Sequence, residues 1–163
     1  MCSILCTSKE ISDYDDVNKY LKFRGPDDTT IIEDESNNFT FLHNLLSMTG
    51  EITSQPFVDD GIVCLYNGEI YNYKDFGDYK SDGYCIIDLY KEYGVDFVKK
   101  LDGEYAILLL DFNSDLILMA TDPFKTKPLF YSNYDGDFGC STYRTPLEKI
   151  KHNDIKKAKP NTA

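Results

Sequence analysis

Short runs in which apolar and polar residues alternate cover much of the chain, and this period of two predicts β-strands. TTIIED and NFTFLHNLL flank the polar turn ESNN and predict one hairpin, and LFYS and DFGCS predict another around Asp135-Gly136. EYAILLLDF and LILMAT, joined by a tight turn at Asn113 to Asp115, are almost continuously apolar, which indicates strands covered on both faces. The opening SILCTS predicts a short buried strand, and GIVCLY predicts a strand that runs into the turn dipeptide Asn67-Gly68.

Other stretches have the helical period. SDYDDVNKYLKF places Val17, Tyr20 and Leu21 on one face of a helix that ends at Gly25-Pro26. After the N-cap pair Ser81-Asp82, YCIIDLYKEYG is periodic up to its final glycine, and VDFVKKL predicts a second helical piece. Because the elements do not follow strict βαβ alternation, the predicted class is α+β with mainly antiparallel sheets. Helices outside a layered sandwich would cover the apolar strands.

Length and charge narrow the picture. The 163 residues, 42% of them hydrophobic, suit a single domain over residues 1–163. The net charge of -11 argues against nucleic acid or an anionic membrane as a partner, because both would repel this surface. The sequence has no apolar run of the roughly 18 residues that a membrane helix needs and no secretory signal, so a cytoplasmic protein is expected.

The metal-binding and redox residues are sparse. Five cysteines, an odd number without a CxxC pair, suit a reducing compartment, and Cys6 is interpreted as core packing. With two histidines and no glycine-rich phosphate loop, neither a metal nor an organic cofactor is predicted. DFNSDLILMATD resembles a calcium loop, but Leu116 stands where the turn needs glycine, so a hairpin is expected. His43, in an apolar strand, is interpreted as a hydrogen-bonded structural residue.

Cys2 is the strongest candidate for chemistry. If Met1 is removed, Cys2 carries a thiol together with an α-amino group, whose ordinary pKa of about 7.7 to 8.0 lets it accept the thiol proton. Such a nucleophile needs an oxyanion hole, which the Asn67 side chain and the Gly68 N–H could form, although the same dipeptide also reads as a plain turn. Asp82 likewise reads as a helix N-cap.

Several motifs match one family in order and spacing. From Cys2 to about Ile150 the chain resembles the glutaminase domain of asparagine synthetases, which are class II glutamine amidotransferases and N-terminal nucleophile (Ntn) hydrolases. The motifs are MCSI at the start, RGPDD at 24–28, YNGEIYNY at 66–73, Ser81-Asp82, LDGEYA at 101–106 and DPFKTKPLFY at 122–131. The resemblance implies a four-layer αββα sandwich of two mainly antiparallel sheets.

The resemblance also implies residue roles. Met1 would be cleaved, and the Cys2 thiolate would attack the side-chain amide of glutamine to give a γ-glutamyl thioester and ammonia. Asn67 and Gly68 would stabilise the oxyanion. Glu69 would lie on the substrate-binding loop, Met48 would belong to the substrate-binding residues, and Asp82 would pair with the substrate α-ammonium group, for which an ionised carboxylate is a suitable acceptor.

The chain departs from the family at three places. Leu45 stands where the family has an arginine that clamps the glutamine α-carboxylate, and losing such a pair costs on the order of 1.5–3 kcal/mol. Thr121 and Lys125 replace an arginine and a glycine around the DPF turn. The chain also ends where the ATP-using synthetase domain would begin, so alone it is expected not to make asparagine.

Three hypotheses follow from these matches and departures. The first is a stand-alone glutaminase that hands ammonia to a separate synthetase subunit. The others are a binding or regulatory module without turnover, and a hydrolase of another γ-glutamyl amide; Leu45 motivates both.

Overall fold

The computed structural model describes residues 2–47 and 52–160. They form two compact units, the first from residues 2–46 and 128–158 and the second from residues 47, 52–127 and 159–160. Each unit contains one antiparallel sheet and is described by itself. The expectation of a single domain over the whole chain stays a prediction.

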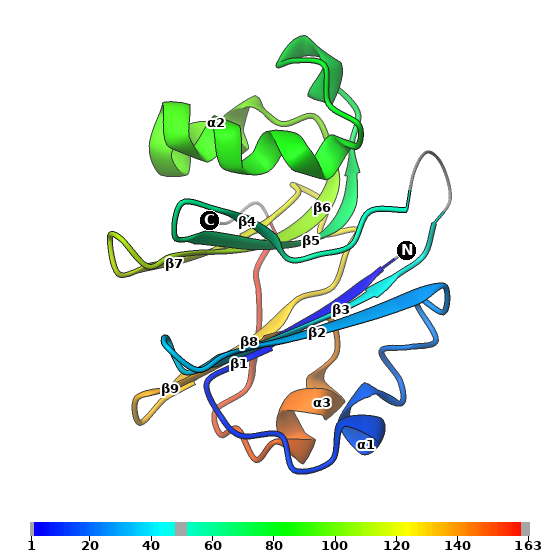
Figure 1. Ribbon diagram of the computed structural model, residues 1–163, viewed down its shortest axis with the longest axis vertical. Coiled ribbons are helices and arrows are strands. Elements are labelled where there is room, and N and C mark those ends of the chain that lie inside the picture. The colour runs from blue at the N-terminus through cyan, green and yellow to red at the C-terminus, as the bar shows by residue number, and fades with distance from the viewer. Residues whose placement is uncertain (1, 48–51, 161–163) are drawn as a thin grey trace. The chain divides into compact units, whose positions relative to one another are not determined.

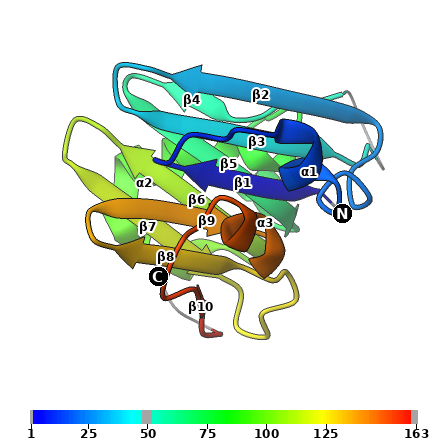
Figure 2. The same ribbon diagram turned by 90° about the horizontal axis from the view of Figure 1, so that it is seen from below.

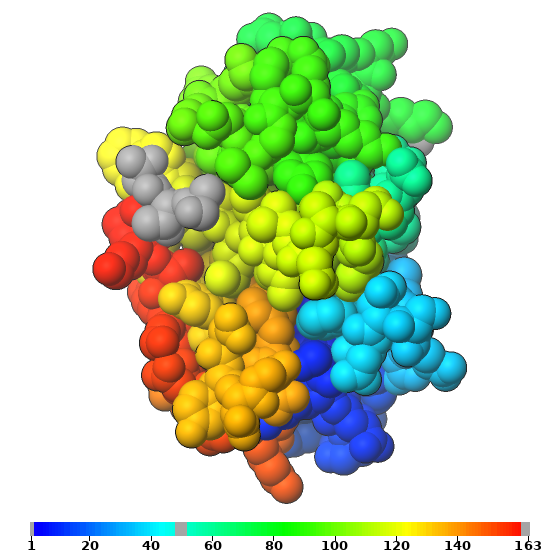
Figure 3. All heavy atoms as spheres, turned by 90° about the vertical axis from the view of Figure 1, so that its left-hand side faces the viewer, coloured from blue at the N-terminus to red at the C-terminus, as the bar shows by residue number. Residues whose placement is uncertain are grey.

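The sheet of the first unit has the strand order β10-β8-β9-β1-β3-β2, with every neighbouring pair antiparallel (Figures 1 and 2). Its strands are β1 (Ser3–Thr7), β2 (Asp28–Asp34), β3 (Phe39–Leu45), β8 (Phe130–Tyr134), β9 (Asp137–Ser141) and β10 (Lys156–Lys157). Both hairpins that the sequence predicted in this unit are confirmed, β2–β3 and β8–β9. In Figure 3 the orange β8–β9 hairpin, a blue N-terminal segment and the light-blue β2–β3 hairpin follow one another at the surface, in keeping with the order of the sheet.

Two short helices, α1 (Tyr14–Asn18) and α3 (Arg144–Lys149), lie on one face of this sheet (Figure 2). They enclose a core to which β1 contributes Leu5 and β3 contributes Leu42. The predicted helix from Ser12 is correct at its start, where Asp13 accepts a hydrogen bond from the Asp16 N–H, but it is too long. Past Asn18 the chain continues as turns, because the Arg24 N–H bonds the Leu21 carbonyl in a tighter i+3 pattern. Tyr20 is 47% exposed, so its place on the buried face is wrong.

The second unit contains the sheet β4-β5-β6-β7, also antiparallel. Its strands are β4 (Phe57–Asp59), β5 (Ile62–Ile70), β6 (Gly103–Asp111) and β7 (Leu116–Thr121). The predicted β6–β7 hairpin is confirmed, and Asp115 in its turn has a φ of 58°.

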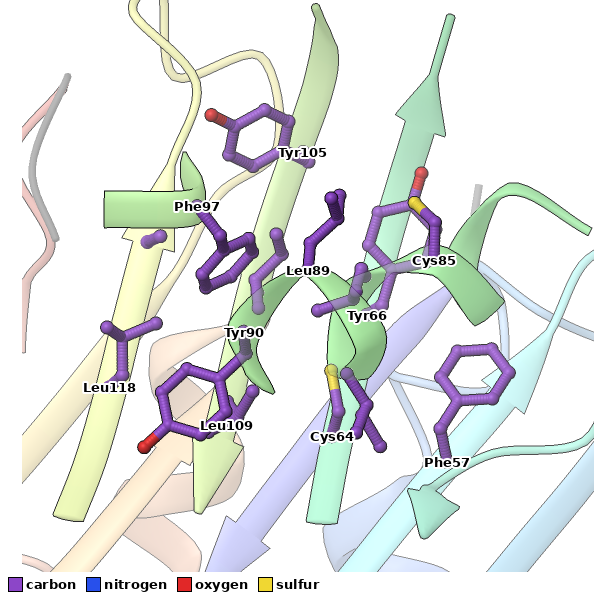
Figure 4. Close-up of a cluster of buried hydrophobic side chains, with 14 of the residues drawn as sticks. Phe57, Cys64, Tyr66, Cys85, Leu89, Tyr90, Phe97, Tyr105, Leu109 and Leu118 are labelled. Atoms are coloured by element: carbon purple, nitrogen blue, oxygen red, sulfur yellow. The ribbon is translucent and has the colours of Figure 1, made fainter. Parts of the chain in front are cut away.

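Helix α2 (Cys85–Tyr93) packs on one face of this sheet, and the positive φ of Gly94 ends it as predicted. Figure 4 shows the core between them, where Leu89 and Tyr90 of α2 and Phe97 meet Leu109 of β6 and Leu118 of β7. Three 3₁₀ segments, Tyr73–Asp75, Asp82–Tyr84 and Gly94–Lys100, complete the unit. The last of these is the predicted second helical piece. The α+β class with two antiparallel sheets is therefore confirmed.

Candidate active site

Cys2 immediately precedes β1 in the first unit. Ser3 faces the helices, since its Oγ donates to the Leu21 carbonyl at 2.8 Å, and strand alternation therefore turns Cys2 to the opposite face. Arg24 Nε donates to the Cys2 carbonyl at 3.0 Å, and its guanidinium lies 5.5 Å from the Tyr143 ring centre. Cys2 is partly exposed whereas the other four cysteines are buried, as was expected of Cys6. The Cys2 backbone is thus held in place, and the residue as a whole stays partly exposed.

Leu45 lies directly across from Cys2. Ser3 pairs with Asn44 in the β1–β3 register, so the next pair outward is Cys2 with Leu45, and such cross-strand Cβ atoms are about 4.5–5.5 Å apart. Leu45 is only 7% exposed. The position at which the resemblance implies a carboxylate clamp is therefore a cross-strand neighbour of Cys2, and it is apolar.

His43 lies on the same face as Cys2 and Leu45, paired with Ile4. Burial lowers its pKa to about 4, against the opposing effect of the Asp28 carboxylate, so the imidazole is neutral at pH 7. Its Nε2 has no hydrogen-bond partner among the described residues. The prediction of a hydrogen-bonded structural histidine is wrong for this nitrogen, whose residue has Ile4 of β1 and Thr30 of β2 as cross-strand partners.

Asn67 and Gly68 lie in the second unit and do not form a turn. β5 continues through both to Ile70, in register with β6. A Cβ on Gly68 would lie 2.2 Å from the Glu104 carbonyl oxygen, so glycine is required for the close approach of two strands and not for a bend. Predicting a turn here was wrong for that reason.

The Asn67 side chain is fully buried without hydrogen bonds. It is 0% exposed, and neither Oδ1 nor Nδ2 has a partner among the described residues. Asn67 faces away from α2, since its neighbours Tyr66 and Ile70 belong to the core beneath that helix. A buried unpaired amide costs about 1–3 kcal/mol, which suits a group that waits for a ligand.

On one edge of β5, side chains accept hydrogen bonds from backbone N–H groups. The Tyr66 N–H donates to Gln55 Oε1 at 2.6 Å, and the Ile70 N–H donates to Asp82 Oδ2 at 2.8 Å. Gly68 lies midway between them, so the alternation of the strand points its N–H to the same edge. β4 pairs only with residues 62–64, and no described strand pairs with this stretch of the edge.

Asp82 is fixed to this edge by three donors. Besides the Ile70 N–H, Oδ2 accepts from the Tyr66 hydroxyl at 2.6 Å, and Oδ1 accepts from Ser81 Oγ at 3.1 Å. Burial and the Asp82 carboxylate raise the pKa of Tyr66 well above its usual value, so its hydroxyl stays a donor. Asp82 does not cap α2, which begins three residues later. With three of about four acceptor positions used, roughly one remains for a ligand.

The other predicted residues are placed as follows. Glu69 is exposed and lies on β5, not on a loop, and it pairs across the sheet with Glu104. Strand alternation puts Glu69 on the same face as Asn67. Met48 lies outside the described residues. The structure thus gathers Asn67, Gly68, Glu69 and Asp82 around one end of β5.

The turn after β7 is organised by Asp122. Its carboxylate accepts from the backbone N–H groups of Phe124 at 2.9 Å and Thr126 at 3.0 Å, and from Thr126 Oγ1 at 2.6 Å. Burial raises the pKa of Asp122, but these hydrogen bonds outweigh it, and the net pKa is below its ordinary value.

Acid is therefore expected to destabilise the protein partly through Asp122. A carboxylate with a depressed pKa contributes stability above its unfolded-state pKa of about 3.9, and this contribution is lost as the pH falls through the folded-state pKa. In urea unfolding between about pH 5 and pH 2, Asp122→Asn should lose stability less steeply than the wild type. Equal slopes would contradict this role.

Lys125 stands in this turn with a φ of 54°, at the position where the resemblance leads one to expect glycine. Lys125→Gly is expected to raise the free energy of unfolding by about 0.5–1 kcal/mol, since relief of the left-handed conformation exceeds the added freedom of the unfolded chain. Lys125→Ala keeps a Cβ and should bring no gain. A gain of equal size in both variants, measured by urea unfolding, would trace the effect to the lysine side chain instead.

Within residues 2–47 and 52–160, no three His, Cys, Asp or Glu side chains gather as metal ligands. In the same stretch, no helix is long and apolar enough to cross a membrane.

The two antiparallel sheets agree with the amidotransferase fold that the sequence motifs imply, and comparison with known proteins supports the same family. A family model described as a glutamine amidotransferase domain matches residues 1–159. The chain belongs to this family, and within it to the class II domains of asparagine synthetase type.

Particular relatives show the extent of the similarity. The chain is 31% identical to the putative asparagine synthetase (glutamine-hydrolyzing) 1 of Methanocaldococcus jannaschii over 161 residues, covering 81% of this chain and 29% of that protein. It is 36% identical to asparagine synthetase (glutamine-hydrolyzing) 2 of Bacillus subtilis over 123 residues, covering 69% of this chain and 16% of that protein. The chain therefore spans less than a third of the length of these relatives.

Among solved structures, the glutamine phosphoribosylpyrophosphate amidotransferase of Bacillus subtilis has a similar fold. The TM-score is 0.70 at 14% identity, and the match covers 98% of this chain and 46% of that one. At this level of identity the likeness shows the fold alone.

Proposed function

We propose that this chain is a glutaminase that hydrolyses the side-chain amide of glutamine to glutamate and ammonia. The observation that carries the proposal is the fully buried Asn67 amide without a partner, next to the edge N–H of Gly68. The Asn67 amide has no hydrogen-bond partner in the described chain, the Gly68 N–H points to the strand edge by alternation, and an oxyanion needs two such donors. The partly exposed Cys2 supplies the nucleophile.

The proposed reaction needs water as its only co-substrate. After removal of Met1, the α-amino group of Cys2 takes the thiol proton as Sγ bonds the amide carbon. The C–N bond then breaks and the nitrogen receives that proton. Ammonia departs, and the γ-glutamyl group remains bound to Cys2 as a thioester. Water then adds to the thioester, the S–C bond breaks, and glutamate and the thiol are released. Asp82 holds the substrate α-ammonium group through its remaining acceptor position, and Glu69 and Met48 belong to the substrate pocket.

As proposed, the chain performs only the amide-hydrolysing half of an asparagine synthetase reaction. The names of its relatives suggest that ammonia passes to a synthetase, either a separate subunit or a further part of the same protein. This partner is inferred from those names and from the family.

The proposal is tested by glutamate release. A sample shown by intact mass to lack Met1 should release glutamate from glutamine, and a Cys2→Ala sample should not. No difference between the two would refute the proposal, whereas a sample retaining Met1 should be inactive because its α-amino base is blocked.

Leu45 favours a second candidate. With an apolar residue across from Cys2, the α-carboxylate of free glutamine lacks the expected clamp. The site would then bind an amino acid without turnover, or hydrolyse a γ-glutamyl amide whose carboxylate is blocked. Calorimetry that finds glutamine binding without glutamate release would favour the first of these, and faster turnover of glutamine α-methyl ester than of glutamine would favour the second.

A further inference from the structure

His43 and His152 are both buried, and each has one ring nitrogen without a hydrogen-bond partner in the described chain. His152 is 6% exposed; its Nε2 bonds Thr7 Oγ1 at 2.8 Å, and its Nδ1 is the nitrogen without a partner among the described residues. His43 is 1% exposed, and no hydrogen bond joins its Nε2 to a described residue. A buried ring nitrogen without a hydrogen bond costs free energy of folding unless a ligand or a water molecule supplies the missing bond.

The position of His43 indicates which ligand this is. Cys2 and His43 lie on the same sheet face in diagonal positions of the β1–β3 register, and such positions are about 7–8 Å apart. At that separation, a group bonded to Cys2 Sγ would extend toward the imidazole. Asp28, which pairs with Leu45, is the charged group of β2 nearest to this position in the register. The other titratable groups on this sheet face lie farther along it and are Asp34, Cys6, Cys140, Tyr131 and Lys156.

The neutral state of His43 sets what it can do. With its pKa lowered to about 4, the imidazole holds one proton, and with that proton on Nδ1 the Nε2 atom is an acceptor. An acceptor beside a thioester carbon suits an N–H or O–H donor. The leaving amide nitrogen and the entering water are both donors, and they occupy the same position on that carbon in turn.

We propose that His43 Nε2 accepts a hydrogen bond from the amide nitrogen that leaves Cys2-bound substrate as ammonia, and then from the water that replaces it. His43 undergoes no net change of protonation, so the balance of the reaction is unchanged. This inference rests on the proposed glutaminase function and adds a catalytic residue to it.

The test compares glutamate release by His43→Phe and wild type, both lacking Met1. Phenylalanine keeps a ring but removes the acceptor, so kcat should fall about 10- to 100-fold while KM changes less than about threefold. The melting temperature should stay equal or rise, because an unpaired nitrogen is lost. His152→Gln is the matched control, and both its kinetic constants should stay within about twofold of wild type.

The outcomes separate the two proposals. An active wild type with an unchanged kcat in His43→Phe would overturn the role of His43 and leave the glutaminase intact. A kcat loss accompanied by a clear drop in melting temperature would show a structural role and overturn it as well. An inactive wild type would overturn both the glutaminase proposal and the role of His43. If phenylalanine does not fit, His43→Gln, which keeps an acceptor, should exceed His43→Met in kcat, and equal values would overturn the inference.

Discussion

Asn67→Leu is expected to lower kcat for glutamine by about 10²- to 10³-fold, the usual cost of losing one oxyanion-hole donor. Leucine has a similar shape and removes the amide that has no partner in the described chain. The free energy of unfolding should therefore stay the same or rise. A buried residue whose replacement stabilises the protein while it abolishes turnover is typical of a site that binds its ligand only in the transition state.

Steady-state kinetics and urea unfolding on the same sample measure both effects. Cys2 alkylation by iodoacetamide provides the control, because Cys2 is the partly exposed cysteine of the described residues and the variant should react at the wild-type rate. A variant with normal kcat would remove Asn67 from the oxyanion hole. A variant that loses stability in proportion to activity would make Asn67 a structural residue.

Asn44→Leu is expected to have the opposite outcome and to lower the free energy of unfolding by about 3–5 kcal/mol. Asn44 is as buried as Asn67, but its amide is fully used. Its Nδ2 donates to Ser3 Oγ at 3.0 Å and to Asn18 Oδ1 at 2.8 Å, and its Oδ1 accepts from Thr29 Oγ1 at 2.9 Å. With leucine at this position, all three partners would remain buried or half-buried, and each would lose a hydrogen bond.

Urea unfolding at pH 7 measures this loss. Asn133→Leu, at an exposed position of β8, makes the same chemical change and should shift the free energy of unfolding by less than about 0.5 kcal/mol. A loss below about 1 kcal/mol in Asn44→Leu would mean that the network rearranges around the leucine.

The elements that the sequence predicted well are those whose cause is local. Both hairpins of the first unit follow from strand alternation and from turn residues such as Asp135, whose φ of 57° suits its place in a tight turn. Asn67-Gly68 has the same local signature as a hairpin turn. Its true cause, the approach of the Glu104 backbone from β6, lies 36 residues away and leaves no mark near Gly68.

Only those residues of the candidate site that belong to sequence motifs could be predicted. The residues around the end of β5 were identified because the family resemblance names them. Gln55, which holds the Tyr66 N–H, and Arg24, which holds the Cys2 carbonyl, act through contacts that no spacing rule indicates. The missing partner of His43 Nε2 is likewise a property of packing, since an apolar strand with one histidine is compatible with a paired or an unpaired ring.

The bond from the Ile70 N–H to Asp82 Oδ2 has one further consequence. It makes the proposed ammonium-binding carboxylate and the proposed oxyanion donors parts of a single hydrogen-bonded strand edge, so the separation between them is set by the strand itself. Such an edge would select substrates by the distance between their ammonium group and their side-chain amide. Asparagine, shorter than glutamine by one methylene group, would reach one end or the other but not both, and selection by side-chain length would follow from the backbone alone.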